Sequence, residues 1–439
     1  MGARMTPPTT NSPSAKPPSS RWQATDGRGK SVHHLRTTCR ACSQATLHRV
    51  LQLGNQPLAN AFLRSPLDAQ HETRFPLELY FCTTCSLVQL ADVIDPEVLF
   101  AEYIYVTGTS STIAVHNQEY ARTVRDRLTL GANDLVVEVA SNDGSLLGCF
   151  KEFGGRILGV EPARNIAALA ESRGIPTVNR FFDEAAGHEL RSAHGAARAV
   201  IGNNVLAHVD DTQGFLRGAA ALIADDGAVI VEVPYAREML LNCEYDTIYH
   251  EHLCYFSVTS LAHLAQRVGL AVDDVQERQV HGGTIRVWMR KQSSHGARAL
   301  EMMAAEEANG LSTLAAWEGF ARRAAEHRRS LRLMLEELHG RGKVVAGYGA
   351  PAKGNTMLNY CGIDPTLVPY TVDRNPLKVG TFTPGMHIPV LDVKTLLERS
   401  PDFVLILAWN FAEEIMEQQQ AYRDRGGRFI VPIPSPRIA

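Results

Sequence analysis

The stretch from Asp134 to Phe150, DLVVEVASNDGSLLGCF, constrains the fold more than any other part of the chain. An apolar, β-branched run over 135–139 is followed at once by the small polar turn SNDG and then by apolar residues at helical spacing. This order predicts a strand, a tight turn and the start of a helix. Such a turn directs free backbone N–H groups toward a bound ligand.

A second unit of the same kind follows in the run GVEPARNIAALAESRG, which predicts another strand that ends in Glu161 and another helix. An acid at that point can accept hydrogen bonds from the hydroxyls of a ribose. The first turn lacks a complete G-x-G-x-x-G, so a dinucleotide is disfavoured and S-adenosylmethionine (SAM) fits better. The alternative is an ordinary strand–helix–strand unit with a solvated acid.

Polar residues recur where the later predicted strands end. The runs ARAVIGNNVLAHVDD and GAVIVEVP continue the alternation of strands and helices, which implies a parallel sheet with helices on both faces. Ligands of such sheets bind at the carboxyl ends of the strands. We therefore expect one SAM site that collects Glu138, Ser141, Asn142, Asp143, Gly144, Glu161, Asn203 and Asn204.

Two C-x-x-C pairs, CRAC and CTTC, contain four of the eight cysteines. So few cysteines in 439 residues indicate a reducing compartment, and we expect a cytoplasmic protein. Two such pairs predict one closed, structural zinc site, although free thiols or a redox pair would be the alternative. The expected zinc ligands are Cys39, Cys42, Cys82 and Cys85.

The net charge of −3 and the lack of dense Lys/Arg around the cysteine pairs argue against nucleic acid and membranes as partners. No apolar run approaches the roughly 20 residues of a membrane span. The first 30 or so residues are rich in Pro, Ser and Thr and predict a disordered extension. The expected division is 1–33 extension, 34–100 zinc module, 101–295 SAM-binding domain and 296–439 C-terminal α/β domain.

The run YHEHLCYFS is the densest group of chemical residues. In an extended segment His250 and His252 would face the same side, with Glu251 opposite. This is not the i, i+4 spacing of a helical metal pair, so one general base with polar neighbours is favoured. A polar loop before a helix capped by Ser257 or Thr259 is the alternative.

The C-terminal part follows a long helical stretch over 297–340 and opens with KVVAGYGAPAKGNTML, which predicts a strand, a Gly-rich turn and a helix. Further strands follow, so this part predicts a second small doubly wound sheet. Lys353 beside the glycines favours a phosphate or pyrophosphate, although a turn without a ligand is the alternative. Tyr103 and Tyr105 precede another polar turn and either line a cleft or pack between domains.

Four motifs, in this order, resemble those of the three-domain sugar C-methyltransferases: the paired C-x-x-C, EVASNDGSLL, YHEHLCYFS and GYGAPAKGNTMLNY. That family acts on nucleotide-linked keto-deoxysugars, notably at C-3 of TDP-linked 4-keto sugars. The resemblance spans position 39 to the C-terminus. It implies a zinc module, a Rossmann-like SAM domain and a C-terminal domain that helps hold the nucleotide sugar. One departure is Ala140, where the family often has glycine.

The resemblance also implies roles for single residues. His252 resembles the general base, with Glu251 orienting its ring or shaping its pKa. The remaining matches to active-site residues are Tyr249, His208 and Tyr103. The residues expected at the nucleotide sugar are Tyr105, Gly349, Ala350, Lys353, Gly354, Asn355 and Asp373. Two other classes stay open: an NAD-dependent nucleotide-sugar oxidoreductase, and a zinc-ribbon binding protein with a degenerate methyltransferase core.

Overall fold

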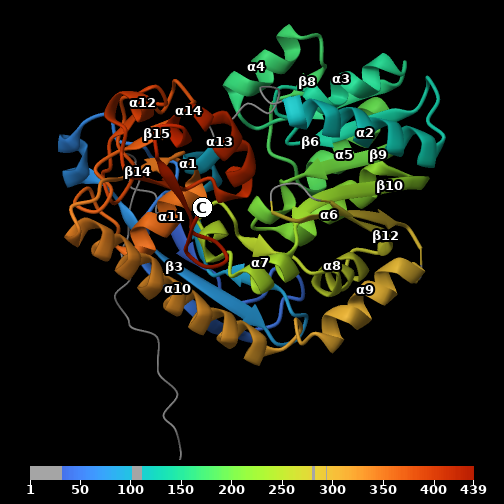
Figure 1. Ribbon diagram of the computed structural model, residues 1–439. Helices are drawn as coiled ribbons and strands as arrows, with labels where there is room; N and C mark the ends of the chain where they lie inside the picture. Colours follow the sequence, from blue (N-terminus) through green and yellow to red (C-terminus); the bar gives the residue numbers. More distant parts are fainter. Residues whose placement is uncertain (1–31, 101–110, 279–281, 293) are drawn as a thin grey trace, which may run out of the picture.

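The computed structural model of the protein describes residues 32–100, 111–278, 282–292 and 294–439. Within these ranges the chain forms sheets of four, seven and six strands and a two-stranded ribbon of β1 (His33–Leu35) and β5 (Asp92–Ile94). Figure 1 shows the seven-stranded sheet, mostly green, on one side and the six-stranded sheet, orange to red, on the other. The blue strands of the N-terminal module lie below them.

The central sheet has the strand order β12-β13-β10-β9-β6-β7-β8. Among these strands, β13 alone runs in the direction opposite to the other six. The strands are β6 (Leu135–Val139), β7 (Arg156–Val160), β8 (Thr177–Val178), β9 (Ala197–Asn203), β10 (Ile223–Pro234), β12 (Ala271–Arg278) and β13 (Thr284–Arg290). The parallel arrangement brings the carboxyl ends of β6, β7 and β9 to one edge, as predicted.

Helices cover both faces of this sheet because its strands are apolar on both sides. Val136 of β6 packs with Tyr120 and Leu147 on one face, whereas Val137 belongs to the main core with Phe215 on the other. The helices are α2 (Ser111–Leu128), α3 (Ser145–Glu152), α4 (Arg164–Ser172), α5 (Glu184–His194), α6 (Thr212–Leu222), α7 (Ala236–Asn242) and α8 (Val258–Gln266). The predicted Rossmann-like domain is confirmed.

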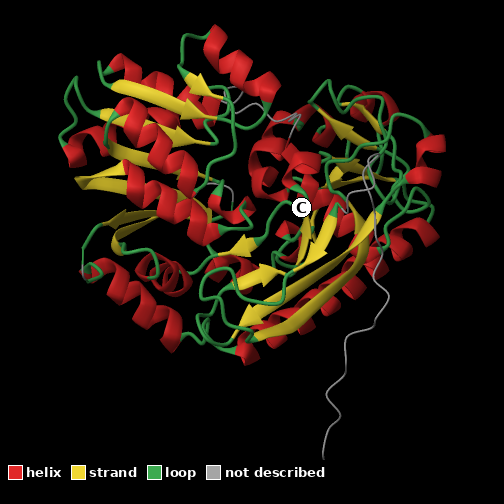
Figure 2. Cartoon of the chain, turned by 180° about the vertical axis from the view of Figure 1, so that it is seen from behind, coloured by secondary structure: helices red, strands yellow, loops and turns green. Residues whose placement is uncertain are grey.

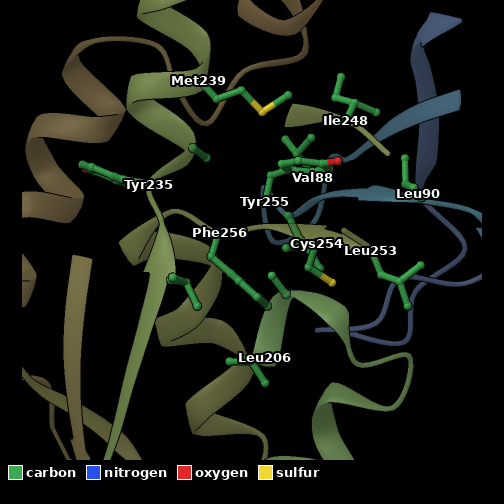
Figure 3. Close-up of a cluster of buried hydrophobic side chains, with 14 of the residues drawn as sticks. Val88, Leu90, Leu206, Tyr235, Met239, Ile248, Leu253, Cys254, Tyr255 and Phe256 are labelled. Carbon is green, nitrogen blue, oxygen red and sulfur yellow. The ribbon is translucent and has the colours of Figure 1, made fainter. Parts of the chain in front are cut away.

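The four-stranded sheet has the order β11-β4-β3-β2 and joins two distant parts of the chain. The N-terminal module supplies β2 (Leu47–Pro57), β3 (Arg74–Cys82) and β4 (Val88–Leu90), and also contains η1 (Pro66–His71) and α1 (Pro96–Phe100). The fourth strand, β11 (Cys254–Tyr255), lies directly after the HEH run and pairs antiparallel with β4. Figure 3 shows the buried apolar cluster around this junction.

The C-terminal sheet has the order β16-β15-β14-β17-β18-β19, and its first five strands are parallel. Its strands are β14 (Val345–Tyr348), β15 (Thr371–Asp373), β16 (Val390–Asp392), β17 (Phe403–Ile406), β18 (Arg428–Val431) and β19 (Arg437–Ile438). Its helices are α11 (Ala352–Cys361), α12 (Thr395–Arg399), α13 (Ala412–Gln418) and α14 (Gln420–Arg423). The second doubly wound sheet is therefore confirmed.

The long helical stretch between the two domains is broken into α9 (Ala297–Ala308) and α10 (Leu314–Gly340). Thr313 starts α10 because its hydroxyl accepts the N–H of Ala316. Helix α10 packs against β2 and α11, so it spans the N-terminal module and the C-terminal domain, as Figure 2 shows from behind. Within the described ranges, no helix has both the length and the apolarity to cross a membrane.

Candidate active site and cofactor sites

Four buried cysteines of the N-terminal module come together. Their sulfur atoms all lie within 4.8 Å of one another, with 3.4 Å between those of Cys39 and Cys85 and 3.5 Å between those of Cys42 and Cys82. None of the four forms a disulfide. Tetrahedral zinc with Zn–S bonds of about 2.3 Å requires sulfur atoms about 3.8 Å apart, so the set fits one structural Zn²⁺. The predicted zinc site is confirmed.

The turn after β6 has a left-handed backbone at three positions. Ala140, Asn142 and Gly144 have φ angles of 55°, 49° and 74°. A Cβ at Gly144 would lie 2.7 Å from a carbon of Ile175, so space as well as conformation requires glycine there. Helix α3 begins at the next residue, and its first N–H groups face the carboxyl edge of the sheet. Ala140 adopts the left-handed conformation despite its Cβ.

Two buried acids flank this turn. The carboxylate of Glu161, which directly follows β7, accepts the backbone N–H of Asn142 at 3.0 Å and that of Ala163 at 2.9 Å. Burial raises the pKa of Glu161 and holds that of Glu138 well above its ordinary range, with nearby Asp143 adding to the shift. A positive charge placed beside such carboxyls would stabilise their ionised form. This edge therefore suits a cationic ligand.

Three polar atoms at this edge are buried and have no hydrogen-bond partner among the described residues: Glu138 Oε2, Ser141 Oγ and Asn203 Oδ1. Buried polar atoms in native proteins nearly always have a partner, so unpaired ones indicate a ligand or an ordered water. Together with the two buried acids, they fit SAM, which carries ribose hydroxyls and positive charge.

Two of the expected SAM residues also have partners within the protein. The carboxylate of Asp143 accepts from Ser145 Oγ at 2.6 Å and pairs with Arg173 at 2.5 Å. Asn204, with a left-handed φ of 53°, donates its N–H to the carbonyl of Glu232 at 2.8 Å. These bonds brace the two loops that form the edge.

The turn after β14 repeats the geometry of the turn after β6. Gly349 is left-handed with a φ of 85°, and Ala350 donates its N–H to the carboxylate of Asp373 at 2.7 Å, at the end of β15. Lys378 donates to the carbonyl of Ala350 at 2.8 Å. A Cβ at Gly354 would lie 2.8 Å from a leucine side chain after β17, so glycine permits close packing of α11.

Two partly buried lysines distinguish this second edge. Lys353 Nζ lies 4.3 Å from the centroid of the Trp409 ring. Burial lowers the pKa of Lys353 and of Lys378, while nearby Asp246 and Glu244 oppose the shift at Lys353. A negatively charged ligand would stabilise such lysines in their charged form. The C-terminal edge therefore suits an anion.

The imidazole of His252 is held at both nitrogens. Its Nδ1 lies 2.9 Å from the carbonyl oxygen of Thr247, the last residue of η4 (Tyr245–Thr247), and its Nε2 lies 2.6 Å from the Tyr249 hydroxyl. A carbonyl only accepts, so Nδ1 carries the proton and Nε2 is the acceptor. Burial lowers the pKa of His252 well below its ordinary value, and nearby His208 adds to the shift. The ring is therefore neutral at pH 7.

His208 is the last residue of η3 (Leu206–His208). The centroid of its ring lies 4.9 Å from that of the His252 ring, in an edge-to-face contact. Burial lowers the pKa of His208 to about 4, so it too is neutral. The structure thus brings together His252, Tyr249 and His208 from the predicted catalytic set. Tyr103 and Tyr105 lie outside the described residues.

Glu251 faces the N-terminal module. Its carboxylate accepts from Asn60 Nδ2 at 2.7 Å. Burial raises the pKa of Glu251 to about 7, against the opposing influence of Asn60 and Lys378. Glu251 is expected to orient the His252 ring or to shape its pKa. The described hydrogen bonds of the ring go to Thr247 and Tyr249 and none goes to Glu251, so the role of Glu251 stays a prediction.

The HEH run forms a turn. His250 Nε2 lies 3.2 Å from the carbonyl oxygen of Pro76, and the His250 ring packs edge-on against Phe75 at 5.9 Å. The prediction that His250 and His252 share a face is therefore wrong, since a turn lacks the two-residue period of a strand. The expected cap of the next helix is confirmed at Ser257, whose hydroxyl accepts the N–H of Ser260 at 3.0 Å.

A segment of the N-terminal module contacts both the HEH turn and the C-terminal domain. Asn60 bonds Glu251, and the carbonyl of the preceding Ala59 accepts from Asn355 Nδ2 of α11 at 2.8 Å. Lys378 Nζ lies over the ring of Phe62, 5.1 Å from its centroid. All three parts of the chain therefore meet at this site.

Trp409, at the start of η5 (Trp409–Phe411), completes the junction. Its Nε1 donates to the carboxylate of Asp246 at 2.6 Å, and burial raises the pKa of that carboxyl to about 6. Sequence reasoning missed Asn60, Thr247 and Trp409. The only available signal was the closeness of Thr247 to the HEH run, because the other two are distant in sequence and no motif marks them.

Three family models match the chain in succession. They describe a zinc binding domain over residues 39–100, a methyltransferase domain over 114–275 and a C-methyltransferase C-terminal domain over 279–434. The chain is 40% identical over 403 residues to C-methyltransferase NovU of Streptomyces niveus, and the match covers 91% of this chain and 96% of that protein.

Solved structures match less than half of the chain and at lower identity. A SAM-dependent methyltransferase of Thermotoga maritima is 17% identical, covers 41% of this chain and 89% of its own, and has a TM-score of 0.31. Magnesium protoporphyrin IX methyltransferase of Synechocystis PCC 6803 is 13% identical, covers 42% and 89%, and has a TM-score of 0.33. Similarity at this level adds nothing to the assignment.

The match to NovU spans nearly the full length of both proteins, and the three family models follow one another along the chain. SAM and structural zinc are the cofactors that the residues fit. The assignment supports a SAM-dependent C-methyltransferase over the oxidoreductase and the zinc-ribbon binding protein considered above. The chain belongs to the SAM-dependent C-methyltransferases that carry an N-terminal zinc-binding domain.

Proposed function

We propose that the enzyme methylates the carbon next to the ketone of a nucleotide-linked keto-deoxysugar, with TDP as the nucleotide and C-3 of a 4-keto sugar as the acceptor. The observation that carries the proposal is the His252 ring, which is neutral and directs a basic Nε2 at a hydroxyl 2.6 Å away. The resemblance of YHEHLCYFS and GYGAPAKGNTMLNY to the sugar enzymes supports the substrate class.

His252 is the proposed general base. A C–H bond becomes acidic beside a ketone because the negative charge moves to the enolate oxygen, so removing this proton requires a base that is free at neutral pH. The lowered pKa keeps Nε2 unprotonated but also weakens it as a base. Hydrogen-bond donors at the enolate oxygen must therefore supply part of the stabilisation.

Tyr249 and His208 are the proposed donors within the described residues. The Tyr249 hydroxyl lies on Nε2 and would turn to the substrate oxygen once the substrate C–H takes its place. His208 is neutral and so carries one ring proton, and its ring also bonds the backbone of Glu251; it donates to the enolate from the buried Nδ1, which has no described partner, only in the tautomer that holds the proton there. Tyr103 is the third candidate by resemblance. When bound, SAM supplies an electrophilic methyl group, which the resulting carbanion attacks.

Binding of the two ligands follows the charges of the two edges. We assign the ribose of SAM to Glu161 and its positive charge to the side of Glu138. We assign the diphosphate of the nucleotide sugar to Lys353 and Lys378, near the N-terminus of α11, whose free N–H groups favour anions. Gly349, Gly354 and Tyr105 remain expected neighbours of the substrate, whereas Ala350, Asp373 and Asn355 also make the bonds described above.

A substrate panel tests the proposal. The enzyme and SAM are incubated with TDP-linked 4-keto-deoxysugars, with their UDP-linked counterparts and with the matching 4-hydroxy sugars. We expect mass spectrometry to show one added methylene on the TDP-linked keto sugars only, and NMR to place the methyl group on carbon. Methylation of a 4-hydroxy sugar, or on oxygen, would refute the enolate mechanism.

A further inference from the structure

Arg40 lies between Cys39 and Cys42, the first C-x-x-C pair, which we call the zinc knuckle, and its side chain is fully buried. Its backbone N–H donates to Gln89 Oε1 at 3.1 Å, and its Nη1 donates to the same oxygen at 3.2 Å and to the carbonyl of Leu90. Gln89 Nε2 in turn donates to the sulfur of Cys39 at 3.1 Å. Arg40 therefore ties the zinc knuckle to strand β4.

The other edge of the same guanidinium reaches the loop after His208. Arg40 Nε donates to the carboxylate of Asp210 at 3.0 Å, and Arg36 donates to the same oxygen at 3.1 Å. The carbonyl of Arg40 also accepts from Gln213 Nε2 at 3.0 Å, in the first turn of α6. The knuckle thus fixes the chain just after His208.

Arg40 has two sets of contacts, one through Leu90 of β4 and one through Asp210, and we call them its two arms. Each arm leads to a loop that carries one of the two histidines. Strand β4 pairs with β11, and the Leu90 N–H donates to the carbonyl of Leu253, the residue after His252, at 2.9 Å. The Leu253 N–H donates to the carbonyl of Ala207, the residue before His208, at 2.7 Å. Arg40 is thus connected by hydrogen bonds to both loops that carry the histidines. The centroids of the His208 and His252 rings are 4.9 Å apart.

We propose that Arg40 is a positioning residue that sets the geometry of the His208–His252 pair, so the zinc knuckle aligns the active site as well as stabilising the fold. This inference rests on the proposed function of His252. Because a misplacement of about 1 Å can slow an enzyme about 100-fold, a clamp on both histidine loops acts on turnover. Among the described residues, the hydrogen bonds of Arg40 go to neither charged edge, so we expect the binding of SAM and of substrate to be unchanged.

Kinetic comparison of Arg40→Met and Arg40→Lys with wild type tests the inference. Each variant is first shown to keep one zinc per chain by elemental analysis and an unchanged SAM Kd by calorimetry. We expect kcat to fall roughly 10- to 100-fold in Arg40→Met with little change in KM. Arg40→Lys keeps the positive charge but cannot make both sets of contacts. We therefore expect its kcat to lie between those of Arg40→Met and wild type. Exchange of the ketone's α-proton with deuterated solvent should slow in parallel.

The matched control is Arg49→Met, in β2 of the same sheet, where an exposed arginine pairs with Glu78. We expect wild-type kcat from it. Wild-type turnover in Arg40→Met overturns the inference, as does an equal loss in the control. If Arg40→Met does not fold, Asp210→Asn tests the second arm alone, and wild-type kcat in that variant also overturns it. A wild-type enzyme without activity on keto sugars, by contrast, would refute the proposed function.

Discussion

The central and C-terminal sheets offer the same backbone device with opposite charge. In each, the turn after the first strand is left-handed, and a carboxylate at the end of the neighbouring strand accepts a backbone N–H of that turn: Glu161 from Asn142, and Asp373 from Ala350. Around the first turn burial raises the pKa of two carboxyls. Around the second it lowers the pKa of two lysines, which lie beside the carboxyls of Asp246 and Glu251.

Under the proposed function, each turn supplies a binding edge and the surrounding charges select the ligand. A raised carboxyl pKa and a lowered lysine pKa both mean that the charged form lacks a sufficient counter-charge, which a ligand can supply. SAM brings positive charge and a nucleotide sugar brings negative charge. In the proposed mechanism the neutral pair of His208 and His252 performs the chemistry.

The substitution His252→Asn should have the largest effect, because it tests the separation of chemistry from binding. Asparagine keeps polarity and approximate size but cannot take the proton. We expect kcat to fall roughly 10²–10⁴-fold, with SAM and substrate affinities unchanged by calorimetry. His250→Asn, which alters the histidine packed on Phe75, is the control. Loss of SAM binding in His252→Asn would show that the loop belongs to the cofactor site.

The substitution Lys353→Met tests the anionic half of the comparison. A charge-assisted hydrogen bond contributes about 1.5–3 kcal/mol, so nucleotide-sugar affinity should fall roughly 10- to 100-fold while SAM affinity stays the same. Equilibrium binding of each ligand alone is the measurement. Lys343→Met, at an exposed lysine paired with Asp402 in the same domain, is the control. An equal loss of SAM affinity would contradict the assignment of charges.

The substitution Glu161→Gln tests the edge that is assigned to the cationic ligand, SAM. It should change ligand affinity less than Lys353→Met does. The amide retains one acceptor, but loses the charge and clashes with one of the two backbone N–H donors. We expect SAM to bind about 3- to 10-fold more weakly, with nucleotide-sugar affinity unchanged. The exposed Glu171→Gln of α4 is the control. Unaltered SAM binding in Glu161→Gln would place the ribose elsewhere.

The smallest expected effect concerns stability at Glu251, between the edges. Its folded-state pKa of about 7 exceeds the ordinary value, so the folded protein holds this proton more tightly. Its contribution to stability is therefore fully present at low pH and is lost as pH rises from about 4.5 to about 7. Glu251→Gln should flatten this dependence and raise Tm at pH 8, relative to pH 5, by about 2 °C. An unchanged difference would mean that Glu251 is ionised throughout.

Local patterns in the sequence predicted both sheets and the zinc ligands, because strand–turn–helix units and C-x-x-C knuckles form from neighbouring residues. The site was only partly predictable. The carbonyl of Thr247 orients His252, and main-chain atoms carry no residue-type signal. Asn60 bonds Glu251, but the two residues are 191 positions apart in the sequence, and no periodic pattern predicts such a distant contact. The HEH run misled because the strand period was applied to a turn.

The pairing of β11 with β4 has a consequence for chimeras between relatives. Recombination at the borders of the matched regions would separate residues 39–100 from the short strand at 254–255 that completes their sheet. Strand β4 would then come from one parent protein and its partner β11 from the other. Gln89 would face a residue of the other parent in place of its own partner, Cys254. A chimera that exchanges the cysteine-rich module should therefore keep its function only when the loop over 247–256 is exchanged together with the module.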